Sequence, residues 1–176
     1  MGGNFNIDRG SKELFKQIMD GLFWRTITDV PEETTYPIDI FMTGLTSNGK
    51  SKAYAVELKE RWKYLSTDYG TSASTEGWII EDRKVSNLEE TENSGYTPIY
   101  ACFFKDGVLA VWDLSKLPEG WRDRRDGVKT FHLHTVGDEG GTYRKSKTGL
   151  WFKDCVMILK YDKERDSWSD CRERYS

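Results

Sequence analysis

Two acidic residues lie inside apolar, strand-like runs in the first third of the chain, where core residues are expected. Asp39 belongs to the run 36–43 (YPIDIFMT), and Glu57 belongs to the run 53–61 (AYAVELKER). Successive side chains of a strand point to opposite faces, so Glu57 and Lys59 share a face. Two carboxylates and an ammonium group on neighbouring strands are suitable side chains for a hydrolytic metal site.

The connection between these runs decides whether the two acids face each other. Asn48 and Gly49 favour a tight turn. A plain two-residue turn would pair Asp39 with Leu58, on the wrong face. A three-residue loop that ends at Gly49 in the left-handed conformation pairs Asp39 with Glu57 on one face. We expect this loop if the acids act together, although a bulge elsewhere in the hairpin could restore the same parity.

A pair of carboxylates with Cβ atoms about 5 Å apart repels itself unless a positive charge lies between them. Mg²⁺ typically takes one or two protein carboxylates, keeps several waters and coordinates substrate phosphate. Lys59, next along the same face, could hold or deprotonate the attacking water. The residues therefore predict a Mg²⁺ or Mn²⁺ site for phosphodiester hydrolysis.

The pattern P-x-D, seventeen residues and then E-x-K resembles the PD-(D/E)xK nuclease superfamily. That group includes restriction endonucleases, Holliday-junction resolvases and phage or repair exonucleases. The resemblance implies a restriction endonuclease-like αβββαβ core over residues 10–115, with DNA as substrate. It implies that Asp39 and Glu57 are metal ligands and that Lys59 orients or activates the water. The literal Pro-Asp pair is missing, because one residue separates Pro37 from Asp39.

The resemblance also implies contributions from the two helices of such a core. Glu13 lies where the first helix often supplies an acid, so it would be a third metal ligand. It could equally be a solvated charge at the start of a helix. Lys84 is the candidate from the later helix, where we expect a contact to the nucleic acid.

The elements that position these residues follow from the periodicity of apolar side chains. Residues 11–23 predict a helix whose buried face carries Leu14, Phe15, Ile18 and Leu22. Lys105-Asp106-Gly107 is typical of a hairpin. Strands are expected at 23–30, 36–43, 51–61, 98–104 and 108–114, and a second helix at 75–91, although 78–80 could begin a strand.

Further strands are expected beyond this core. The runs 130–136 and 151–161 are strand-like, and the charged last fifteen residues could fray. We therefore expect one α/β (α+β) domain over residues 1–176, with a mixed central sheet. Its C-terminal strand extension would cover about 128–162.

Two basic clusters could bind backbone phosphates or could simply be surface charge. One is the run 122–125 (RDRR), in which Asp123 weakens the positive charge. The other contains Arg144, Lys145 and Lys147, which we expect to contact nucleic acid. Positive charge of this kind would have to act locally, because the net charge of the chain is −3.

Histidines and cysteines give weaker indications of chemistry. His132 and His134 share one face of a strand and could bind a metal, but an ordinary amphipathic strand is the favoured interpretation. Cys102, Cys155 and Cys171 are far apart and odd in number. We expect free thiols in a reducing cytoplasm, without structural zinc.

Composition limits the remaining classes of function. No run approaches the roughly 20 apolar residues of a membrane span, and no secretory signal is expected. The sequence predicts a cytoplasmic, metal-dependent deoxyribonuclease with DNA as partner. It leaves a homodimer open and is compatible with a phage or mobile element. Two alternatives stay open. One is an inactive nuclease-fold protein that binds nucleic acid or protein, and the other is an aromatic-rich interaction domain unrelated to nucleases.

Overall fold

The computed structural model describes residues 10–22, 24–28, 37–46, 48–67, 78–123 and 147–175. The expected strand 130–136, with His132 and His134, lies outside these residues, as do Arg144 and Lys145. Within the described segments, no helix is long and apolar enough to cross a membrane.

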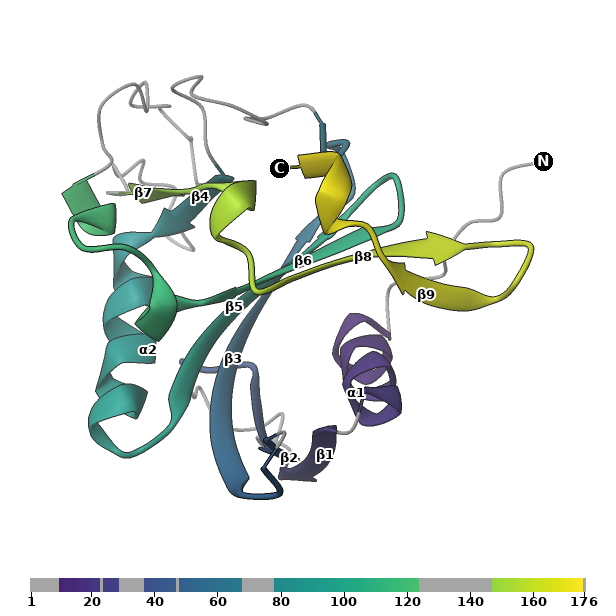
Figure 1. The fold of residues 1–176 in the computed structure, drawn as a ribbon. Coiled ribbons are helices and arrows are strands. Elements are labelled where there is room, and N and C mark those ends of the chain that lie inside the picture. The colour runs from purple at the N-terminus through teal and green to yellow at the C-terminus, as the bar shows by residue number, and fades with distance from the viewer. Residues whose placement is uncertain are drawn as a thin grey trace, which may run out of the picture.

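A mixed seven-stranded sheet with two helices forms the body of the described chain (Figure 1). The strands follow the spatial order β1-β2-β3-β5-β6-β8-β9. Neighbouring strands are antiparallel except for the parallel pair β3 and β5. This arrangement confirms a mixed α+β fold. The elements are α1 Ser11–Gly21, β1 Trp24–Thr28, β2 Ile40–Leu45, β3 Ser51–Arg61, α2 Asp82–Asn93, β5 Thr97–Phe104, β6 Val108–Asp113, β8 Met157–Asp162 and β9 Ser167–Asp170.

The helices cover opposite faces of this sheet (Figure 1). Phe15, Ile18 and Met19 of α1 pack in a core with the even-numbered apolar residues of β3, here called the α1-side core. Leu22 was expected on this buried face but is 38% exposed, because α1 ends before it at Gly21. The α2-side core contains, among others, Ile38, Ala55, Val85, Leu88, Tyr100, Cys102 and Trp112.

The prediction of a helix over residues 75–91 was wrong for its first part. Residues Trp78–Glu81 form β4, which pairs with β7, Lys147–Leu150, in a separate two-stranded sheet. Aromatic and β-branched residues favour strands, and Ile80 of β4 is buried in the α2-side core. Helix α2 therefore begins at Asp82 and carries the chain from β3 across to the parallel strand β5.

The hairpin between β2 and β3 has the predicted loop. Thr46 N–H donates to the carbonyl oxygen of Lys50 at 2.8 Å, and Gly49 N–H donates to that of Thr46 at 2.8 Å. Gly49 has φ +75°, in the left-handed region. The resulting register pairs Ile40 with Val56, which confirms the three-residue loop.

The C-terminal segment is docked rather than frayed. Strand β9 pairs with β8, and a short 3₁₀ helix, Arg172–Tyr175, follows. The Tyr175 ring stacks on Phe152 with centroids 4.7 Å apart, and its hydroxyl lies 2.7 Å from Ser66 Oγ. The expected strand 151–161 begins only at Met157, because Phe152–Asp154 forms a 3₁₀ turn.

The loop at Gly49 gives a test of the hairpin. A Cβ at Gly49 would meet no atom within 4 Å, so Gly49→Ala should cost only the left-handed strain, about 1 kcal/mol of unfolding free energy. Gly21→Ala, in open space at the end of α1 and without positive φ, is the control and should be neutral or slightly stabilising. Urea denaturation measures both. Equal stability of Gly49→Ala and the parent protein would contradict the assigned loop.

Candidate active site

Glu57 is a carboxylate held inside the protein between β3 and α2. Its side chain points to the α2 face because alternation sends its neighbours Val56 and Leu58 into the α1-side core. Glu57 is only 1% exposed, and its Oε1 atom forms an ion pair with Lys84 Nζ of α2. The Lys84 side chain is 32% exposed, so it reaches the acid from the surface. Lys84, expected from the later helix, is thus brought to Glu57.

Lys59 and Arg61 extend this polar face along β3. The parallel register pairs Glu57 with Tyr100 and Lys59 with Cys102, so these side chains share the α2 side of the sheet. Burial raises the pKa of the Cys102 thiol to about 12, although Arg61 opposes the rise. Burial also raises the pKa of the Tyr100 hydroxyl, and both groups therefore stay neutral.

Arg61 was not singled out from the sequence, although it continues the same alternation two residues after Lys59. Burial lowers the pKa of Arg61, but its interactions with Tyr100 and Cys102 outweigh burial and the net shift is upward. The guanidinium therefore stays charged. Its half-buried position places a second fixed cation on the face that carries Glu57.

Asp39 occupies a local irregularity just before β2. Its N–H donates to the carbonyl oxygen of Val56 at 3.1 Å, although Val56 is already paired with Ile40. Two consecutive residues facing one residue of the partner strand make a β-bulge. The Asp39 Oδ2 atom accepts the N–H of Leu58 at 2.9 Å, and Oδ1 lies 3.2 Å from Lys12 Nζ of α1.

The bulge changes the expected relation between the two acids. The register is the predicted one, but Ile38 packs into the α2-side core and Asp39 pairs with α1. The two carboxylates therefore point to different faces of the sheet and do not repel each other across a shared site. Each has its own lysine, from helices on opposite faces of the sheet. The two residues are nevertheless near each other in space, since the Asp39 carboxylate accepts the N–H of Leu58, the residue after Glu57.

Glu13 does not join the two acids. Its side chain is 61% exposed and pairs with Lys16 at 2.8 Å within α1. The residue of α1 that reaches Asp39 is its neighbour Lys12. Across the described parts of the chain, no group of three or more His, Cys, Asp or Glu side chains is placed to hold a metal ion.

Glu81, at the junction of β4 and α2, also belongs to this region. Its charge adds to the rise in the pKa of Tyr100, after larger effects that begin with burial. The main chain of Lys147 pairs with Glu81. All three cysteines are free, as expected from the sequence.

The arrangement combines one buried acid with several cationic side chains at the boundary between β3 and α2. A carboxylate can hold a hard cation, and neighbouring ammonium and guanidinium groups can hold a phosphate oxygen. Comparison with protein-family models, with curated proteins and with solved structures finds no match for this chain. The function is therefore inferred from the positions and the chemistry of the side chains.

The Glu57–Lys84 pair can be tested by a double-mutant cycle. Lys84→Met would strand a buried carboxylate and should lower the unfolding free energy by about 3 kcal/mol. Adding Glu57→Gln should restore part of the loss, with a coupling energy of at least about 1 kcal/mol. Arg83→Met, at the exposed neighbouring position of α2, is the control and should change stability by about 0.5 kcal/mol or less. Strict additivity of the two changes would contradict the pair.

Proposed function

We propose that this protein is a divalent-metal-dependent nuclease of the PD-(D/E)xK type that hydrolyses phosphodiester bonds in DNA. The observation that carries the proposal is the ion pair between Glu57 of β3 and Lys84 of α2, on the face that also carries Lys59. These three residues are the ones that the resemblance to this superfamily assigns to the strand and to the later helix.

The order of the elements supports the same proposal. Leaving out β4, the chain passes through α1, β1, β2, β3, α2 and β5, and its sheet has the order β1-β2-β3-β5. The first three strands are antiparallel and the last is parallel to β3. We interpret this order as an αβββαβ core with β4 inserted before α2. Strands β6, β8 and β9 extend the sheet beyond it, and β4 with β7 adds a small second sheet.

The acids fit a hard divalent cation in their chemistry. Mg²⁺ and Mn²⁺ prefer oxygen ligands, and Mg²⁺ commonly uses only one or two protein carboxylates. Among the described residues, the Glu57 carboxylate forms an ion pair with Lys84 Nζ through Oε1. Glu57 would hold the cation on the α2 side of the sheet, and Asp39 would join it as a ligand only after its carboxylate leaves Lys12 of α1. When bound, the cation would polarise the scissile phosphate and lower the pKa of a coordinated water.

The chain's own cations would act on the phosphate and the attacking water. Lys59 would orient the water and stabilise negative charge as it develops in the transition state. Lys84, displaced from Glu57 by the cation, would contact a backbone phosphate. Both side chains are half-buried and keep access to solvent.

A second candidate is a nuclease-fold protein without catalysis, which binds nucleic acid or protein. The bulge at Asp39 favours it, because this carboxylate is already bonded to Lys12 and to the main chain of β3. Loss of the catalytic arrangement would leave the same fold and the same cations available for binding.

A cleavage assay decides between these candidates. We expect Mg²⁺- or Mn²⁺-dependent cleavage across a panel of single-stranded, duplex and branched DNA, abolished by chelation of the metal. Glu57→Gln, Asp39→Asn and Lys59→Met should each lower the rate by about 100-fold or more, because each removes a ligand or a water-positioning group.

Matched controls lie on the same strand. Glu60→Gln and Lys52→Met change an acid and a lysine of β3 at even-numbered positions, which face away from Glu57 and Lys59. Both should keep the parent rate. Cleavage unaffected by Glu57→Gln would exclude this site, and DNA binding without cleavage would support the non-catalytic candidate.

A further inference from the structure

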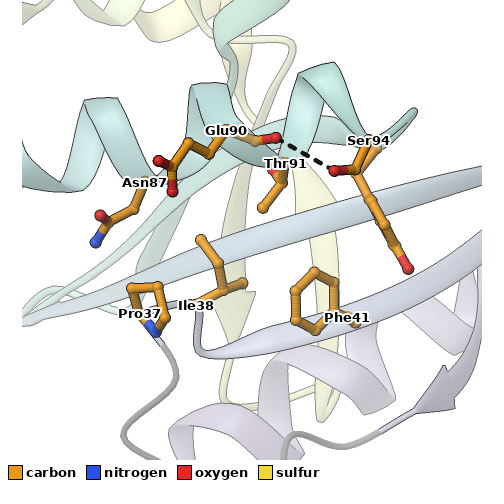
Figure 2. Close-up of a pocket in the computed structure, with 8 residues that line it drawn as sticks. Pro37, Ile38, Phe41, Asn87, Glu90, Thr91 and Ser94 are labelled. Carbon is orange, nitrogen blue, oxygen red and sulfur yellow. Dashed lines mark hydrogen bonds between the residues drawn. The ribbon is translucent and has the colours of Figure 1, made fainter.

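A pocket of about 580 Å³ lies between α2 and the segment that enters β2 (Figure 2). Ile38 and Phe41 form its floor, and Asn87, Glu90 and Thr91 project from α2 along the opposite side. Its volume is within the range of small-ligand sites, about 300–1,000 Å³.

The pocket adjoins both acids of the candidate active site. Ile38 in its floor directly precedes Asp39 in the chain. Asn87 follows Lys84 by three residues, so it lies about one helical turn from the Glu57–Lys84 pair on the same side of α2. A ligand in this pocket would therefore lie beside the position proposed for the scissile phosphate.

Two polar groups in the pocket have no partner within the described chain. The Asn87 carboxamide and the Glu90 carboxylate make no hydrogen bond or ion pair through their side chains there. The Thr91 hydroxyl donates to the carbonyl oxygen of Leu88 at 2.6 Å, which leaves its oxygen free to accept. These groups offer several acceptors and one amide donor group to a ligand.

The rest of the lining indicates what kind of ligand would fit. Phe41 and Tyr96 meet edge to face, with ring centroids 5.0 Å apart, and give the pocket an aromatic wall. The lining includes no lysine, arginine or histidine, and the Glu90 carboxylate would repel an anion. A planar, uncharged ligand with amino groups suits this lining better than a phosphate.

We propose that this pocket binds one unstacked nucleobase that carries an exocyclic amino group, such as adenine or cytosine. Asparagine pairs well with the adenine edge, and glutamate accepts from the amino group of cytosine. Aromatic side chains provide contacts for an unstacked base. The inference rests on the proposed nuclease function, and it adds that the nucleotide beside the cut is read by Asn87 and Glu90.

Titration with nucleosides tests the pocket without any cleavage step. Deoxyadenosine, deoxycytidine and thymidine would each be added to the ¹⁵N-labelled parent protein without metal. We expect chemical-shift changes at the Asn87 side-chain amide and at Thr91 with the two amino-bearing nucleosides. Thymidine should bind at least several-fold more weakly. Asn87→Ala should weaken binding of deoxyadenosine by about tenfold.

Asn93→Ala is the matched control, since Asn93 is an exposed residue of the same helix that does not line the pocket. It should leave binding unchanged. Absence of shifts with every nucleoside, equal binding of thymidine, or equal loss in both variants would overturn the inference. Cleavage of DNA without nucleoside binding would overturn the pocket alone. Nucleoside binding without cleavage would overturn the nuclease and support the pocket.

Discussion

The burial of the Glu57 carboxylate constrains everything around it. An ionised acid in a packed interior is costly unless a positive charge accompanies it, and Lys84 supplies that charge from α2. This pairing fixes the approach of the helix to β3. It also keeps an acid, rather than an apolar side chain, buried between β3 and α2. Nothing in packing alone requires an acid there, which is why we interpret it as functional.

Much of the fold follows from local patterns in the sequence. The turn residues around Gly49 and Gly107 predict both hairpins, and both glycines have the positive φ that these turns need. Patterns failed where long-range pairing decides the structure. The local sequence left residues 78–80 open between helix and strand, and pairing with the distant segment Lys147–Leu150 accompanies the strand, which a window of neighbouring residues cannot reveal.

The candidate site was predictable in its strand residues and not in its details. Alternation along β3 placed Glu57 and Lys59 on one face, and the resemblance to nucleases indicated Lys84. The bulge at Asp39 could not be predicted from the sequence, because it depends on the packing of the Ile38 side chain in the α2-side core. Glu13 was indicated by the resemblance and was equally open as a solvated charge. In the structure it pairs with Lys16, whereas the preceding residue Lys12 reaches Asp39.

The parallel contact between β3 and β5 has a consequence for how the protein matures. These strands are separated by a long crossover, so their contact closes a large loop and depends on non-local pairing. Glu57 and Tyr100 come together only when that contact forms. A chain that has formed only the hairpin of β2 and β3 would therefore lack the contact that places Glu57 opposite Tyr100.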